Sequence, residues 1–125
     1  MYELMVRGSF AAAHRLREYG GACEKLHGHT WRVEVHLSGE KLNPLGILVD
    51  FRVAKRALRA ALKALDHTYL NEIPPFDQSN PTTENLSRYL CERLAEAMPD
   101  GVGIRKVVVW ESSDCCGAYV PDENP

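Results

Sequence analysis

Two histidines separated by one glycine, His27 and His29, are the residues of this sequence best suited to bind a metal ion. They open a segment, 27–37, in which apolar side chains follow at odd positions and polar ones occupy the even positions. This alternation predicts a half-buried β-strand, in which alternate residues face the same side about 6.5–7 Å apart. The two imidazoles therefore point from one strand face toward one place. Neutral imidazoles are typical zinc ligands, and Gly28 between them leaves room for close approach.

A third ligand is expected from His14, which ends an alternating segment over residues 2–14. If this segment pairs antiparallel with the one that starts at His27, His14 lies opposite the His27 and His29 pair. Three histidines with an open fourth position are typical of catalytic zinc. The competing interpretation is a closed structural site in which Cys23 supplies the fourth ligand.

Cys23 and the neighbours Asp66 and His67 are candidates for proton transfer. Cys23 lies four residues before His27, and a thiolate stabilised by a nearby cation serves as a base or a nucleophile. The alternative is a loop cysteine without a catalytic role. Asp66 can orient His67 for acid–base chemistry, or the two residues can simply form a polar helix end. Both interpretations of this pair stay open at this stage.

Glu111 ends an apolar segment, 104–111, and its carboxylate is a candidate for binding a heterocycle. A carboxylate so placed can accept two hydrogen bonds from an amidine-like edge, such as an aminopyrimidinone ring, or pair with an arginine. Thr82, Thr83 and Glu84 stand at the start of a predicted helix. Helix capping is the default role for these three residues, and a polar wall beside a heterocycle is the alternative.

Composition bounds the class of protein. The chain has 125 residues, of which 45 % are hydrophobic, and this predicts a single globular domain over residues 1–125. A net charge of −2 gives no electrostatic footprint for nucleic acid or a membrane surface. No stretch approaches the roughly 20 apolar residues that span a bilayer, and no secretory signal is evident. The four cysteines lack the spacing of a disulfide framework, so we expect a reducing, cytoplasmic setting.

The elements that must position these residues follow from periodicity. We predict strands over 2–14, 27–37, 104–111 and 118–120, and helices that begin after Asp50 and near Thr82. The first helix is expected to end near Asp66, and Gly8 is expected to kink or bulge the first strand. The order β-β-α-α-β-β predicts an α+β fold: a four-stranded antiparallel sheet with two helices on one face.

Six short motifs, in this order, resemble the 6-pyruvoyl-tetrahydropterin synthase family over nearly the whole chain. They are Phe10-Ala11-Ala12-Ala13-His14, Cys23-x-x-x-His27-Gly28-His29, Gly46-Ile47-Leu48-Val49-Asp50-Phe51, Leu65-Asp66-His67-x-x-Leu70-Asn71, Pro81-Thr82-Thr83-Glu84-Asn85 and Trp110-Glu111-Ser112. The three-residue gap between Cys23 and His27 resembles the 6-carboxytetrahydropterin synthase branch, which serves queuosine synthesis.

The resemblance implies a role for each candidate residue. His14, His27 and His29 would hold zinc; Cys23, Asp66 and His67 would transfer protons; Glu111 would anchor a pterin ring framed by Thr82, Thr83 and Glu84. Arg15 and Lys25, on the loop beside the site, are the candidates for contact with a triphosphate. The implied enzyme is a zinc-dependent lyase that converts 7,8-dihydroneopterin triphosphate to 6-carboxy-5,6,7,8-tetrahydropterin, acetaldehyde and triphosphate.

The resemblance also implies the assembly. A sheet with free edges and one uncovered face needs a partner, and members of the family adopt the tunnelling fold, in which trimers close a barrel and two trimers form a homohexamer. Active sites would then lie between subunits, and Glu111 and the threonines could serve a neighbour's zinc. Two alternatives remain: a pyruvoyl-branch synthase that releases triphosphate only, and a non-catalytic zinc- and pterin-binding module.

Overall fold

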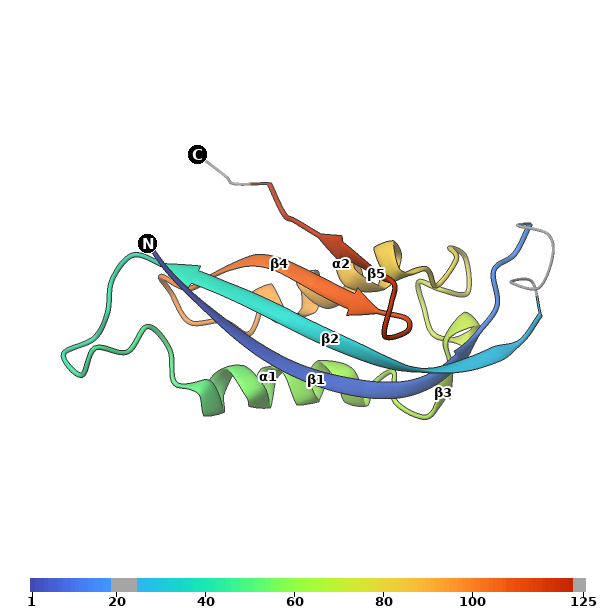
Figure 1. The fold of residues 1–125 in the computed structure, drawn as a ribbon, viewed down its shortest axis with the longest axis horizontal. Coiled ribbons are helices and arrows are strands. Elements are labelled where there is room, and N and C mark those ends of the chain that lie inside the picture. The colour runs from blue at the N-terminus through green and yellow to red at the C-terminus, as the bar shows by residue number, and fades with distance from the viewer. Residues whose placement is uncertain (19–24, 123–125) are drawn as a thin grey trace.

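A curved five-stranded sheet with two helices packed on one face forms the framework of the protein (Figure 1). The structure is a computed structural model and describes residues 1–18 and 25–122. Its strands are β1 (Tyr2–His14), β2 (His27–Gly39), β3 (Thr68–Tyr69), β4 (Gly103–Trp110) and β5 (Cys116–Tyr119), in the spatial order β3-β1-β2-β4-β5. Its helices are α1 (Phe51–Lys63), the short 3-10 helix η2 (Leu70–Glu72) and α2 (Thr83–Ala95).

The long β1–β2 hairpin is the central feature of the sheet, and it has the antiparallel pairing predicted from the sequence. The register runs without interruption from Tyr2 opposite Gly39 to His14 opposite His27. Apolar residues at the odd positions of β2, from Trp31 to Leu37, are at most 1 % exposed. A shift by one residue would move this whole row to the other face, so burial fixes the register.

The prediction of a four-stranded, purely antiparallel sheet is wrong. The described residues form a five-stranded mixed sheet, because β3 pairs parallel to β1 through Thr68 and Tyr69. Two residues are too few to show any periodicity, and this strand exists only because the chain turns sharply at His67, whose φ is +58°. The last strand also begins earlier than predicted, at Cys116, and β4 ends at Trp110, one residue before Glu111.

Both predicted helix starts are confirmed by their caps. The Asp50 side chain accepts a hydrogen bond from the backbone N–H of Arg52 at the start of α1, and the Thr82 side chain accepts one from Asn85 at the start of α2. Helix α1 ends at Lys63, and so Asp66 lies in the turn that follows the helix. This turn, rather than the helix, presents Asp66 to β1.

The core lies between the sheet and the two helices, where Phe10, Trp31, Leu58 and Leu90 are each at most 2 % exposed. Gly8 does not bulge β1 away from β2, since their register is continuous. Instead, a Cβ at Gly8 would come within 2.9 Å of the Leu62 side chain, so glycine permits the close approach of α1.

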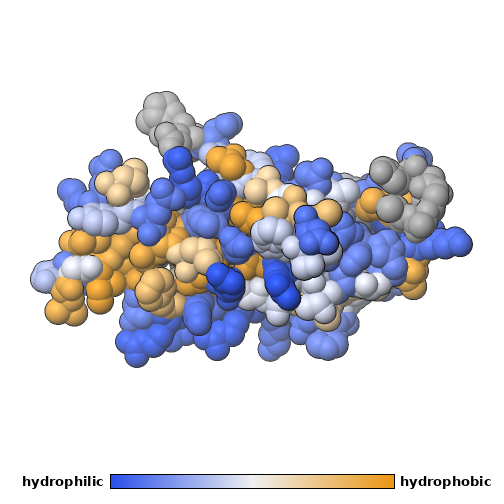
Figure 2. Space-filling view, in the orientation of Figure 1, coloured by the Kyte–Doolittle hydropathy of each residue, from blue (hydrophilic) through white to orange (hydrophobic). Residues whose placement is uncertain are grey.

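Apolar side chains also gather at the end of the molecule where β2 leads into α1 (Figures 1 and 2). The exposed large apolar residues of this connection are Leu42, Leu45, Ile47, Phe51 and Val53. Contiguous exposed apolar surface often marks an interaction site. In the part of the chain that the structure describes, no helix is both long and apolar enough to cross a membrane.

Candidate metal centre and active site

Three histidines and one glutamate converge at one end of the sheet. The β1–β2 register places His14 opposite His27 and Ala12 opposite His29, so the three imidazoles share the face that carries the core. Glu111 reaches the same place from the end of β4, the next strand of the sheet. One ligand atom from each of His14, His27, His29 and Glu111 lies within 4.8 Å of every other. We call this group the histidine cluster.

Hydrogen bonds to carbonyl groups fix the tautomers of two of these histidines. His14 Nδ1 lies 2.8 Å from the Pro81 carbonyl oxygen, and His27 Nδ1 lies 2.7 Å from that of Lys25. A carbonyl only accepts, so each Nδ1 must carry the proton and donate it. Each neutral imidazole therefore presents an unprotonated Nε2, and these two Nε2 atoms are 2.9 Å apart. Two lone pairs facing each other at this distance need a cation between them.

His29 and Glu111 complete the cluster. His29 Nε2 is buried and makes no hydrogen bond, although Glu111 Oε1 lies 3.1 Å away in an orientation unsuited to one. The same oxygen is 3.3 Å from His14 Nε2. Ligand atoms about 2.0 Å from a tetrahedral zinc ion lie about 3.3 Å from one another. The nitrogen and oxygen donors and these short separations therefore fit a site for a divalent metal ion, lined by the three histidines with Glu111 beside them.

Burial keeps two of the histidines in the form that binds metal. His14 is 2 % exposed, and its burial lowers its pKa; the hydrogen bond to Pro81 and the charge of Glu111 offset this in part, and the neighbouring His27 and His29 add to it. Burial also lowers the pKa of His29, partly offset by the negative charge of Glu111. The rings of His14 and His29 stand edge-on to the buried Trp31 ring, which fixes their orientation. Neutral, oriented imidazoles are a requirement for metal binding.

Asp66 and His67 form a second pair, and the structure records no contact between it and the histidine cluster among the described residues. Asp66 Oδ1 accepts the backbone N–H of Ala11 at 2.8 Å, and its Oδ2 lies 2.9 Å from His67 Nδ1. The hydrogen bond from Ala11 is the main cause of a lowered Asp66 pKa. The Asp66 carboxylate therefore orients the imidazole of His67, whose side chain is 82 % exposed and faces away from the subunit core.

The start of α2 lies directly behind the histidine cluster. Pro81 accepts the His14 hydrogen bond, and the next residue, Thr82, caps the helix. The Thr83 hydroxyl donates to the Glu84 carboxylate at 2.7 Å. A side chain on Gly117 of β5 would collide with Thr83. The close approach permitted by Gly117 keeps Thr82, Thr83 and Glu84 beside the strands that lead to Glu111.

The loop residues proposed for catalysis and phosphate binding are placed only in part. Cys23 lies outside the described residues. Arg15 is exposed just beyond His14, and Lys25 is exposed two residues before His27. Their backbones, rather than their side chains, take part in the contacts that the structure records at the site.

Two asparagines that the sequence did not assign to the site hold the chain as it leaves His14. The Asn71 side chain accepts from the backbone N–H of Arg15 at 2.9 Å and donates to its carbonyl at 3.0 Å. Asn80 does the same for Arg17, at 2.8 and 3.1 Å. Each side-chain amide makes the two backbone hydrogen bonds that a residue of a neighbouring strand would make. Together they continue the pairing of β1 beyond His14, its last residue paired with β2. We call this pair the asparagine clamp. The signal available from the sequence was that Asn71 ends the motif Leu65-Asp66-His67-x-x-Leu70-Asn71.

Comparisons with known proteins agree with this geometry. The chain matches the family described as 6-pyruvoyl tetrahydropterin synthase over residues 3–122. It is 35 % identical to the dihydroneopterin monophosphate aldolase of Pyrococcus furiosus, over 89 % of this chain and 90 % of the relative. It is 38 % identical to a putative 6-carboxy-5,6,7,8-tetrahydropterin synthase of Archaeoglobus fulgidus (91 % and 94 % covered) and 35 % identical to the 6-carboxy-5,6,7,8-tetrahydropterin synthase of Synechocystis (89 % and 87 % covered).

Solved structures share the fold. The 6-pyruvoyl tetrahydropterin synthase of Caenorhabditis elegans superposes with a TM-score of 0.86 at 26 % identity, covering 97 % of this chain and 96 % of that one. Family match, sequence identity and fold all lead to the same conclusion. This chain is an enzyme of the 6-pyruvoyl tetrahydropterin synthase family.

Proposed function

We propose that the protein is a zinc-dependent 6-carboxytetrahydropterin synthase acting on 7,8-dihydroneopterin triphosphate in queuosine synthesis. The observation that carries the proposal is the pair of unprotonated Nε2 atoms of His14 and His27, 2.9 Å apart beside the unpartnered Nε2 of His29. Relatives that bear this activity in their names, at 35–38 % identity over most of the chain, support the choice of reaction.

His14, His27 and His29 would hold the zinc ion. When bound, zinc supplies Lewis-acid chemistry toward hydroxyl oxygens of the substrate side chain. Glu111 then takes the role of ring anchor, since a carboxylate can accept two hydrogen bonds from the aminopyrimidinone edge of a pterin. Its position beside the histidines puts the ring next to the metal. Thr82, Thr83 and Glu84 frame the ring from the start of α2.

Proton transfer falls to two separate groups in this proposal. Cys23, as a thiolate, removes a proton from the substrate side chain. His67, oriented by Asp66 at 2.9 Å, supplies or accepts the second proton. Arg15 and Lys25 are exposed on the segments that flank the cluster, where they can reach a triphosphate.

The exposed position of His67 supports an active site shared between subunits. An oriented but 82 % exposed imidazole, with no recorded contact to the histidine cluster of its own chain, is suited to serve a neighbouring cluster. In the part of the chain that the structure describes, β3 and β5 are the edge strands of the sheet, and a neighbour's strand can pair with each of them. We propose a homohexamer of two barrel-forming trimers, located in the cytoplasm.

Product analysis tests the proposed reaction. Zinc-loaded protein is incubated with 7,8-dihydroneopterin triphosphate, and the pterin, the aldehyde and the released phosphate are identified by mass spectrometry. Acetaldehyde and a 6-carboxypterin are expected. A pyruvoyl pterin as the product would show that the protein belongs to the pyruvoyl branch. Binding of zinc and pterin without turnover would show that it is a non-catalytic binding module. Cys23→Ala should abolish turnover while zinc content stays at the wild-type level.

A second candidate function is an aldolase that acts on dihydroneopterin monophosphate, and the Pyrococcus furiosus relative favours it. In a retro-aldol reaction, a base first removes the proton of the hydroxyl group on the second side-chain carbon. The bond between the first two side-chain carbons then breaks, and a proton is added to the first carbon. Glu24, which adjoins Cys23 in the sequence and lies outside the described residues, would provide a carboxylate base.

The aldolase and the synthase reactions can be distinguished by their substrates and by the variants that abolish them. The aldolase would release a 6-hydroxymethyl pterin and glycolaldehyde phosphate from the monophosphate. Glu24→Gln should abolish that reaction and leave the carboxy reaction largely intact, whereas Cys23→Ala should do the reverse. Turnover of the monophosphate alone, sensitive to Glu24→Gln, would replace the first proposal with the second.

A further inference from the structure

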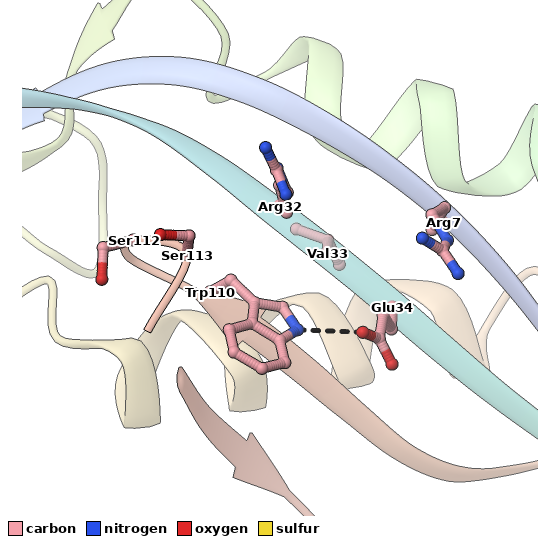
Figure 3. Close-up of a pocket in the computed structure, with 7 residues that line it drawn as sticks. All are labelled: Arg7, Arg32, Val33, Glu34, Trp110, Ser112 and Ser113. Atoms are coloured by element: carbon pink, nitrogen blue, oxygen red, sulfur yellow. Dashed lines mark hydrogen bonds between the residues drawn. The ribbon is translucent and has the colours of Figure 1, made fainter. Parts of the chain in front are cut away.

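A pocket of about 210 Å³ lies on the face of the sheet opposite to α1 and α2 (Figure 3). Its polar and aromatic lining residues are Arg7, Arg32, Glu34, Trp110, Ser112 and Ser113. Strand alternation explains its composition, because the neighbours Val6, Trp31 and Val109 point into the core and are at most 3 % exposed. We call it the open-face pocket, since no helix of the described residues covers it.

Two arginines bring positive charge to the open-face pocket from adjacent strands. Arg7 of β1 lies opposite Glu34 of β2, and Arg32 is two residues before Glu34 on the same face. Arg7 and Arg32 are therefore diagonal neighbours, about 7–8 Å apart at their backbones and within reach of long side chains. Among the described residues, the structure records no hydrogen bond or ion pair for either guanidinium group.

The single carboxylate of the pocket is already engaged. Glu34 Oε2 accepts the indole N–H of Trp110 at 2.9 Å, and its Oε1 lies 3.0 Å from His36 Nε2. Figure 3 shows the Trp110 contact, with Arg7 and Arg32 on the same side of the sheet. These partners hold the Glu34 side chain in place. The pocket thus holds two guanidinium groups and one carboxylate; Arg7 interacts with that carboxylate only through its charge, so the N–H donors of both arginines are available to a ligand.

The remaining donors come from the turn after β4. Ser112 and Ser113 line the pocket next to Trp110, and Trp110 lies opposite Arg32 in the β2–β4 register. Guanidinium groups bind phosphate oxygens with two parallel N–H donors, and hydroxyls add neutral donors. We propose that the open-face pocket binds a phosphate-type oxyanion through Arg7 and Arg32, at a site distinct from the histidine cluster. This proposal does not depend on the proposed reaction.

The test is calorimetric titration of zinc-loaded protein with sodium orthophosphate and, separately, sodium triphosphate. Arg7→Gln and Arg32→Gln should each weaken binding about tenfold, the loss of one charge-assisted contact. Arg56→Gln, an exposed arginine of α1, removes the same charge elsewhere and should leave binding unchanged. Stronger binding of triphosphate would identify a polyphosphate as the ligand source, and equal binding would identify free phosphate.

A variant that binds phosphate more tightly than the wild type cannot owe this change to misfolding. Glu34→Gln removes the negative charge and keeps an oxygen for the Trp110 N–H, so it should tighten binding several-fold. Three outcomes would overturn the proposal. The first is no binding at all, and the second is an equal loss of affinity with Arg56→Gln. The third is binding that disappears with His29→Ala but survives Arg7→Gln and Arg32→Gln. The last pattern would place the anion at the histidine cluster.

Discussion

The Nε2 atoms of His14 and His27 face each other at 2.9 Å, and both rings donate their only proton in the opposite direction, to Pro81 and Lys25. While both rings are neutral, neither nitrogen can donate to the other. The backbone on two sides of the site thus forces lone pairs toward one point, which a divalent cation or a proton must occupy. This relationship motivates the first prediction.

The protein should bind one zinc ion per chain, and His29→Ala should lower the affinity by more than 100-fold. Loss of a residue that only hydrogen-bonds to a metal ligand costs about 10- to 100-fold in affinity, whereas His29 offers a buried Nε2 without a hydrogen bond as a direct ligand. Metal content by mass spectrometry and competition with a chelator measure the effect. The matched control is His36→Ala on the opposite face of β2, and equal losses in the two variants would refute the site.

Metal-free protein should lose stability as the pH falls through 6.5. Burial lowers the pKa of His14 and His29 in the folded state, so the unfolded chain takes up protons first and is favoured. Stability is complete above about pH 6.5 and decreases below it, until the folded-state pKa is reached, with a slope of up to about 1.4 kcal/mol per pH unit for each histidine.

Urea unfolding from pH 8 to 5 in the presence of a chelator measures this slope. His29→Gln should reduce it. A free energy of unfolding that stays constant between pH 7 and 5.5 would contradict the expectation.

Glu111→Gln should separate ring anchoring from metal binding. If Glu111 is the pterin anchor, the three histidines retain zinc and kcat/KM falls by about 100-fold or more, since one strong charge-assisted contact is lost in the transition state. Zinc loss as severe as in His29→Ala would instead make Glu111 Oε1, 3.1 Å from His29 Nε2, a true fourth ligand. Metal titration and steady-state kinetics on the same preparation distinguish the two outcomes.

The asparagine clamp should be necessary for both stability and the geometry of the site. Asn71 is 6 % exposed and binds both backbone groups of Arg15, so Asn71→Ala should cost about 1–3 kcal/mol in the free energy of unfolding. Zinc affinity should fall as well, because Arg15 follows the ligand His14. Gln78→Ala, on the exposed surface nearby, is the control; a destabilised Asn71→Ala with wild-type zinc affinity would limit the clamp to a structural role.

Mixed assemblies should reveal whether the site is shared. Cys23→Ala and His67→Ala subunits, each inactive alone, should regain a fraction of wild-type activity when they are unfolded and refolded together. In a shared site, some interfaces would combine an intact Cys23 from one subunit with an intact His67 from another. No activity in hexamers verified to contain both subunits would place the two groups in one chain.

The sequence by itself determined the strongest elements and the candidate metal ligands. Alternation over the long segments 2–14 and 27–37 is sufficient to predict β1 and β2, because a one-residue slip would expose the entire apolar row. The caps Asp50 and Thr82 are local interactions and can be predicted from neighbours alone. His14, His27 and His29 followed from these strands, since strand period and antiparallel pairing suffice to bring them together.

Only the tertiary structure decided the rest, because those features depend on contacts between distant segments. The two-residue strand β3 has no pattern of its own and pairs with β1 only after the turn at His67. Glu111 meets the histidines because β4 lies beside β2, and Asn71 reaches Arg15 across 56 residues of sequence. The tautomers of His14 and His27, and with them the case for a metal ion, come from carbonyl groups whose positions no sequence period encodes.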